Sequence, residues 1–152
     1  MMQQGDAIPP VTVKTANDEP LALGDQTGPL VVYFYPKDDT SGCTREAQDF
    51  TALARAFEQA GVRVIGISKD SPAKHRKFAE KHALTIELAS DEDGTACEAF
   101  GVWGEKKLYG KTYMGIERAT FLFGRDGKLT QSWRKVTVPG HAEAVLEAAR
   151  AL

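Results

Sequence analysis

Hydrophobic residues along this chain occur in two kinds of pattern, which predict strands in some segments and helices in others. Residues 30–35 are apolar without alternation, as in a central strand covered on both faces. Residues 11–14 alternate between apolar and polar, as in an edge strand. Asp126-Gly127 lies between two apolar segments and is typical of a hairpin turn. The predicted strands are residues 11–14, 30–35, 62–67, 85–89, 119–123 and 129–133.

Apolar residues with helical spacing predict helices between and after these strands. Phe50, Leu53, Ala54 and Phe57 would share one face of a helix that follows residue 43 and ends before Gly61. The other predicted helices run from Ser71-Pro72 to about His82, over residues 93–100, and onward from Gly140-His141. This order of elements predicts an α/β protein with one domain over residues 1–152. A thioredoxin-like fold, in which a central mixed sheet is flanked by helices, is the natural candidate.

Composition narrows the functional classes. The 152 residues include 19 Lys and Arg against 21 Asp and Glu, so the net charge is -2. This balance argues against nucleic acid or a membrane as a partner, because both would select clustered positive charge. No apolar segment reaches the roughly 20 residues of a transmembrane helix, and the first residues lack the basic and apolar regions of a signal peptide. We therefore expect a cytoplasmic protein whose two cysteines are catalytic rather than a structural disulfide.

Cys43 is the strongest candidate for chemistry. It follows Thr40-Ser41-Gly42 at the point where a predicted strand ends and a predicted helix begins. The first turn of a helix offers free backbone N–H groups and the positive end of the helix dipole. Both stabilise a thiolate, which is the nucleophilic form of cysteine. The position therefore predicts a reactive thiol rather than an inert small hydrophobic residue.

Pro36, Thr40 and Cys43 stand in the order Pro-x-x-x-Thr-x-x-Cys, which resembles the active-site signature of peroxiredoxins. The surrounding residues 34–46 are similar to the Q-type branch, also called bacterioferritin comigratory proteins. The resemblance continues through residues 66–71, 90–94, 113–121 and 139–141, and so covers nearly the whole chain. It implies a thioredoxin-like fold and thiol-dependent reduction of hydrogen peroxide and small organic hydroperoxides, with no metal, flavin or haem. It also implies a thioredoxin-like or small-thiol reductant and a monomer or weak dimer.

The resemblance gives each matched residue a role. Cys43 is the nucleophile, and Thr40 offers its hydroxyl and backbone to the peroxide. Arg118 offers fixed donors and a charge that does not titrate, Pro36 shields the sulfur from water, and Glu46 holds the arginine in place. Simpler interpretations stay open at three of these positions. Thr40 could belong to a turn or cap the helix, Pro36 could merely end the strand, and Arg118 could be an exposed charge.

The role of Cys97 is open on the sequence. Some Q-type members carry a second cysteine five residues after the nucleophile, but here that position is Gln48, so the first helix contains no resolving cysteine. Cys97 either resolves oxidised Cys43 after local unfolding or packs in the core while an external thiol does so. We expect resolution by Cys97 slightly more than packing. The chain also has Ser41 where proline is usual, which removes no reacting group.

Other functions fit the sequence less well. The segment Gly104–Thr112 resembles a phosphate-binding loop, but it has one residue too many between its glycines, so we interpret it as a basic surface loop near the active site. We expect the three histidines to be solvated or to cap helices, with no metal site. There is no Cys-x-x-Cys motif of a dithiol exchanger. The remaining alternative is a thioredoxin-fold binding or chaperone-like protein without turnover.

Overall fold

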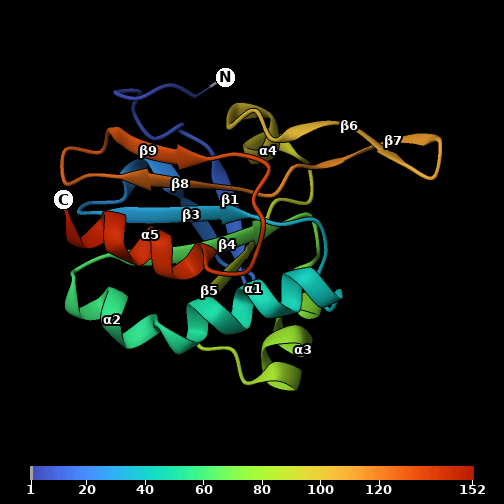
Figure 1. The fold of residues 1–152 in the computed structure, drawn as a ribbon, viewed down its shortest axis with the longest axis horizontal. Helices are drawn as coiled ribbons and strands as arrows, with labels where there is room; N and C mark the ends of the chain where they lie inside the picture. Colours follow the sequence, from blue (N-terminus) through green and yellow to red (C-terminus); the bar gives the residue numbers. More distant parts are fainter. Residues whose placement is uncertain (1) are drawn as a thin grey trace.

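A seven-stranded mixed sheet forms the centre of the molecule in this computed structural model, which describes residues 2–152 (Figure 1). The strand order is β2-β1-β5-β4-β3-β8-β9. Strands β3, β4 and β5 are parallel, while β8 is antiparallel to β3 and β1 is antiparallel to β5. The strands of the sheet are β1 (Thr12–Thr15), β2 (Pro20–Ala22), β3 (Leu30–Phe34), β4 (Arg63–Ser68), β5 (Glu87–Ser90), β8 (Ala119–Phe123) and β9 (Leu129–Trp133).

Helices cover the two faces of the sheet unequally, so the fold has three layers. The helices are α1 (Ser41–Ala52), α2 (Ala54–Gln59), α3 (Pro72–His82), α4 (Thr95–Ala99) and α5 (His141–Arg150), with a short 3-10 turn, η1, at Leu23–Asp25. Figure 1 shows α1, α2, α3 and α5 on one side of the sheet, and α4 and the N-terminal segment on the other. This arrangement confirms the predicted thioredoxin-like α/β fold.

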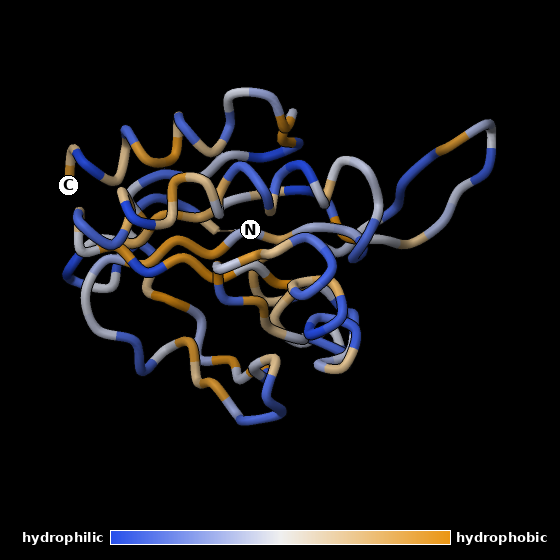
Figure 2. The backbone as a smooth tube through the Cα atoms, turned by 90° about the horizontal axis from the view of Figure 1, so that it is seen from below, coloured by the Kyte–Doolittle hydropathy of each residue, from blue (hydrophilic) through white to orange (hydrophobic). Residues whose placement is uncertain are grey.

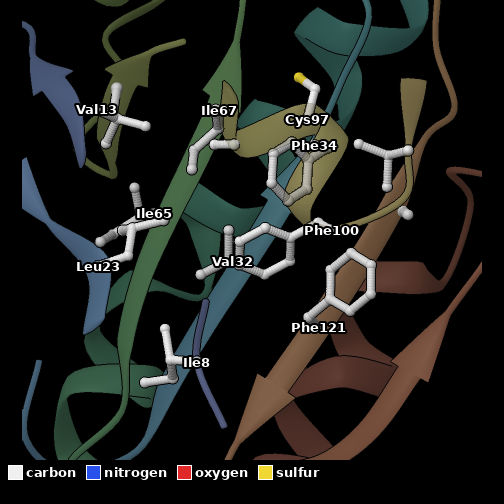
Figure 3. Close-up of a cluster of buried hydrophobic side chains, with 14 of the residues drawn as sticks. Ile8, Val13, Leu23, Val32, Phe34, Ile65, Ile67, Cys97, Phe100 and Phe121 are labelled. Atoms are coloured by element: carbon white, nitrogen blue, oxygen red, sulfur yellow. The ribbon is translucent and has the colours of Figure 1, made fainter. Parts of the chain in front are cut away.

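The position of β3 in the sheet explains why its sequence does not alternate between apolar and polar residues. All five of its residues are buried, and successive side chains enter opposite cores. Val32 and Phe34 join the core under α4, where Figure 3 shows Phe34 beside Phe100. Val31 and Tyr33 join the core under α1, α3 and α5. Figure 2 shows the corresponding apolar segments gathered in the middle of the molecule.

The predicted elements are mostly present, with two corrections. The predicted edge strand is wrong: β1 lies inside the sheet between β2 and β5, and β2 forms the edge. The single helix predicted after residue 43 is two helices, because the backbone leaves helical geometry at Leu53. Phe50 of α1 and Phe57 of α2 nevertheless pack in one core, with ring centroids 5.9 Å apart.

Residues 103–116 form a hairpin, so the expectation of a basic surface loop at Gly104–Thr112 is wrong. Strands β6 (Trp103–Leu108) and β7 (Lys111–Ile116) pair only with each other and project from the body (Figure 1). The turn uses Tyr109 and Gly110, both with positive φ, as a two-residue hairpin requires. Among residues 2–152 no helix has the length and apolar character needed to cross a membrane.

Candidate active site

The pairing of β3 with β8 brings the candidate site residues together. Phe34, the last residue of β3, lies opposite Ala119, the first residue of β8. Because the strands are antiparallel, the chain leaving β3 and the chain entering β8 meet at one edge of the sheet. The first leads to Cys43 and the second carries Arg118. Residues 75 positions apart in sequence thus become neighbours.

Cys43 is the third residue of α1 and is only 2% exposed. Thr40 occupies the N-cap position, and its carbonyl accepts the first helical hydrogen bond, from the Thr44 N–H at 2.8 Å. The amides of Ser41, Gly42 and Cys43 lie ahead of that bond, at the positive end of a twelve-residue helix. Cys43 therefore lies beside the positive partial charge of the helix start.

Arg118 links the thiol to a buried carboxylate. Its Nη2 donates to Cys43 Sγ at 3.3 Å, and its Nη1 donates to Glu46 Oε1 at 2.6 Å. The side chain is only 16% exposed, so the interpretation of Arg118 as an exposed charge is wrong. A planar guanidinium with several fixed donors can hold both partners at once, whereas a lysine ammonium offers a point charge on a flexible stem.

Gly42 makes room for this arginine. A Cβ atom at that position would lie 3.2 Å from Arg118 Nη2, tighter than ordinary packing. The backbone beside Arg118 is also held, since its carbonyl accepts from the Val136 N–H at 3.0 Å. The neighbouring Glu117 pairs with Arg134 at 2.7 Å. The guanidinium therefore fits against Gly42, while the backbone that carries it is anchored at residues 117 and 118.

Glu46 is an acid in an unusual environment. Its residue is 1% exposed, and burial raises the pKa of its carboxyl group to about 7, although the Arg118 charge opposes that shift. Among the described residues, Glu46 Oε2 has no hydrogen-bond partner, and the same holds for Tyr33 Oη. Burial, and next the Glu46 carboxylate, raise the pKa of Tyr33 as well. The Arg118–Glu46 pair therefore has a short hydrogen bond, but burying the two charged groups costs desolvation free energy.

Thr40 and Pro36 lie in the loop between β3 and α1. Thr40 is exposed, and its hydroxyl donates to the Lys37 carbonyl at 2.8 Å rather than capping the helix with its side chain. Because that proton is used, the Thr40 oxygen keeps its lone pairs for an incoming donor. Pro36 is half-buried just after the buried Tyr35, where the strand gives way to the loop.

Cys97 lies on the other side of the sheet from Cys43. Cys43 belongs to the core that contains Tyr33, whereas Cys97 belongs to the core that contains Phe34 (Figure 3). Both cysteines are free and buried. Burial, and next the hydrogen bond with Asp91, raise the pKa of the Cys97 thiol well above its ordinary value. The two sulfur atoms are thus separated by the sheet, and of the two only Cys43 Sγ accepts a hydrogen bond from a guanidinium.

Comparison with known proteins identifies the family. The model of the AhpC/TSA family matches residues 4–132. Peroxiredoxin Bcp of Xanthomonas campestris is 51% identical over 122 residues, which are 80% of this chain and 76% of the relative. Peroxiredoxin Bcp of Bacillus subtilis is 45% identical over 144 residues, 94% of this chain and 92% of the relative. The chain belongs to the Bcp peroxiredoxins of the AhpC/TSA family.

A solved structure agrees with this assignment. The bacterioferritin comigratory protein of X. campestris superposes with a TM-score of 0.89 at 41% identity, over 99% of this chain and 97% of that one. The resemblance to the Q-type branch is therefore confirmed. This peroxiredoxin is a thiol-dependent peroxidase.

Two of the histidines in this peroxiredoxin are buried, which the sequence did not indicate. His75 is fully buried against Asp38, and His141 is 6% exposed with its Nε2 2.8 Å from Thr120 Oγ1. Burial, and next the Arg118 charge, lower the pKa of His141 to about 4. The expectation that the histidines are solvated or merely cap helices is thus wrong for these two. Their partners are distant in sequence, and no local motif announces them.

Proposed function

We propose that the protein reduces hydrogen peroxide and small organic hydroperoxides with Cys43 as its nucleophile. The observation that carries the proposal is the contact of Arg118 with both Cys43 Sγ and the buried Glu46 carboxylate. A permanent cation held against a thiol at a helix start stabilises the thiolate before the reaction. It can also donate to the oxygen on which charge develops as the O–O bond breaks. The structure of the X. campestris relative was described in connection with alkyl peroxide reduction, which supports this substrate class.

The proposed reaction is a nucleophilic displacement at oxygen. The Cys43 thiolate attacks one peroxide oxygen, forming an S–O bond while the O–O bond breaks. The second oxygen leaves as an alkoxide or hydroxide and takes a proton to give an alcohol or water. The product on the enzyme is a sulfenic acid, in which sulfur has been oxidised by two electrons.

Thr40, Arg118 and Pro36 would act on the two oxygens and the sulfur. The Thr40 hydroxyl donates to Lys37, so we infer that its oxygen accepts the hydrogen bond of the hydroperoxide O–H. Arg118 would hold the leaving oxygen as it becomes negative. Pro36 would keep water from the sulfur beside it. Glu46 would act on the reaction through Arg118 and not on the substrate itself.

The return to the thiol needs two reducing equivalents. We propose that an external thiol, from a thioredoxin-like protein or a small molecule, attacks the sulfenic acid and releases water as a mixed disulfide forms. A second thiol then releases Cys43 and takes up the disulfide. The location of Cys97 on the opposite face of the sheet supports this route over direct resolution. A Cys43–Cys97 disulfide would require the backbone around α4 to open first.

A matched pair of variants tests the proposal. Cys43→Ser should abolish peroxide consumption in the presence of excess dithiothreitol, because serine has almost no nucleophilic anion near neutral pH. Cys97→Ser is the control and should keep the first oxidation of Cys43. Both variants should retain wild-type circular dichroism. Substantial turnover in folded Cys43→Ser would assign the nucleophile to another residue, and absence of turnover in the wild type would favour a binding or chaperone-like role.

A further inference from the structure

A closed hydrogen-bond network lies under the loop that precedes Cys43. Tyr35 Oη donates to Asp38 Oδ1 at 2.6 Å, and His75 Nδ1 lies 2.7 Å from Asp38 Oδ2. On the other side of the ring, His75 Nε2 lies 2.9 Å from the carbonyl oxygen of Ala89 in β5. Tyr35, Asp38 and His75 are 1%, 8% and 0% exposed, so water does not complete the network from outside.

The chemistry of the partners fixes how the network is bonded. A carbonyl oxygen cannot donate, so His75 Nε2 must carry a hydrogen and give it to Ala89. The 2.7 Å approach of His75 Nδ1 to Asp38 Oδ2 requires one hydrogen between these two atoms. The second carboxylate oxygen accepts from Tyr35. Every polar group of the three side chains therefore has a partner, as buried polar groups require.

Asp38 is also the best-anchored residue of the loop. Its backbone N–H donates to Asp70 Oδ2 at 2.8 Å, and that carboxylate is in turn held by the Ser68 hydroxyl at 2.7 Å. Asp38 stands two residues after Pro36 and two before Thr40. The Thr40 hydroxyl bonds to the carbonyl of Lys37, the residue next to Asp38. A shift of Asp38 would therefore move the threonine and the start of α1 together.

We propose that His75, acting through Asp38, is a positioning residue for the reaction of Cys43 with peroxide. It joins helix α3 and strand β5 to the loop that carries Pro36 and Thr40, and so fixes where these groups stand relative to the sulfur. A buried carboxylate and imidazole are a costly way to stabilise a fold, since apolar residues of similar size often do as well. The benefit is a fixed geometry at a loop that must orient an O–O bond. The inference rests on the proposed role of Cys43.

Two substitutions at Asp38 separate geometry from mere stability. Asp38→Ala removes the buried connection between His75 of α3 and the loop. Asp38→Asn can keep it, because the amide oxygen still accepts from Tyr35 and the amide N–H₂ donates to His75 Nδ1 of a neutral ring. His75→Phe removes the histidine end of the network, and Tyr35→Phe removes the hydrogen bond to Asp38 together with the longer 3.4 Å contact to His75 Nδ1. His82→Gln is the matched control, since His82 lies on the same helix and contacts the next loop residue, Asp39, at an exposed position where Lys81 also binds.

The readouts are two second-order rate constants of Cys43, one with hydrogen peroxide and one with iodoacetamide, measured on folded protein well below its melting temperature. Alkylation needs only the thiolate, whereas peroxide reduction also needs the oriented loop. Asp38→Ala and His75→Phe should react with peroxide about tenfold more slowly or worse, because small misplacements of reacting groups are costly. Their alkylation rates should stay within about twofold of wild type. Asp38→Asn and His82→Gln should stay within about threefold of wild type for both reagents.

Three results with folded variants would overturn the inference. If Asp38→Ala reacts with peroxide as fast as wild type, the network serves stability alone. If Asp38→Asn reacts with peroxide as slowly as Asp38→Ala, the charge of Asp38 rather than its geometry is decisive. If the alkylation rate of a variant falls together with its peroxide rate, the network acts on the thiolate itself. If His75→Phe fails to fold, the two Asp38 variants and Tyr35→Phe test the inference instead. The rate constant of Tyr35→Phe with peroxide should lie between those of Asp38→Asn and Asp38→Ala. A wild type that consumes no peroxide would instead refute the proposed function before any variant is compared.

Discussion

Glu46 should make the stability of this protein depend on pH in a direction opposite to that of most carboxylates. Burial raises the pKa of Glu46 to about 7 from an ordinary value of 4.5, despite the opposing charge of Arg118. The folded state thus binds the Glu46 proton more tightly than the unfolded state does. Between these two values the folded protein carries more protons, so stability falls as the pH rises. The substitution Glu46→Gln removes this titration while keeping the size of the side chain.

The expected size follows from the shift. The difference between 7 and 4.5 is 2.5 pKa units, and each unit corresponds to about 1.4 kcal/mol. The full effect is therefore on the order of 3 kcal/mol, a large share of the roughly 5–15 kcal/mol by which a domain is typically stable. The contribution is present below the unfolded value and is lost as the pH passes through the folded one.

Urea denaturation of wild type and Glu46→Gln across about pH 4 to pH 8 would measure this contribution of Glu46 to the free energy of unfolding. The loss of the charged Arg118 contact gives the variant a constant offset, because arginine does not titrate here. His141, whose pKa burial and then Arg118 lower to about 4, titrates in both proteins and cancels from the difference. The wild type should therefore lose about 3 kcal/mol relative to the variant as the pH rises. Parallel stability curves would show that Glu46 does not titrate in this range and would refute the reasoning.

Three further predictions concern the reacting groups. Arg118→Ala should slow peroxide reduction about 10- to 100-fold, which corresponds to the loss of a hydrogen bond to a charged group. Arg118→Lys should recover only part of the lost rate, because an ammonium cannot reproduce the planar guanidinium. Unchanged rates of oxidation in stopped-flow experiments would show that Arg118 does not act in the site. Cys43 should be alkylated much faster than Cys97 near neutral pH in single-cysteine variants, because burial and Asp91 raise the pKa of the Cys97 thiol, and the reverse order would exchange their roles. Cys97→Ser should lose stability through a buried hydroxyl yet keep turnover with a small thiol; a Cys43–Cys97 linked peptide in digests of peroxide-treated wild type would instead assign resolution to Cys97.

The hydrophobic pattern was sufficient for the elements that form the two cores. Residues 30–35 show no polar alternation, and residues 119–123 are apolar except for Thr120, because both faces of their strands are buried. Ser71-Pro72 marks the start of α3, where the Ser71 hydroxyl accepts from the Lys74 N–H at 3.2 Å. Such signals are local, so a single sequence is enough to find them.

The hairpin of β6 and β7 shows where that reasoning ends. Its strands pair only with each other, and most of their side chains, Leu108 and Tyr113 included, are exposed. Exposed strands need no alternation of apolar and polar residues, so the segment looked like a loop. The break at Leu53 was equally invisible, because the spacing of Phe50 and Phe57 fits one continuous helix. Tertiary packing decides both features.

The site itself depends on register, which no local motif contains. The motif around Cys43 indicated the nucleophile, and the resemblance supplied Arg118 as its partner, but only the pairing of Phe34 with Ala119 places the two together. A slip of one residue between β3 and β8 would turn every side chain of the slipped strand to the opposite face and carry Arg118 away from the start of α1. Such a slip is opposed by both cores at once, because β3 is buried on each face. The unalternating strand thus does more than fill the interior: it fixes the register on which the contact between guanidinium and thiol depends.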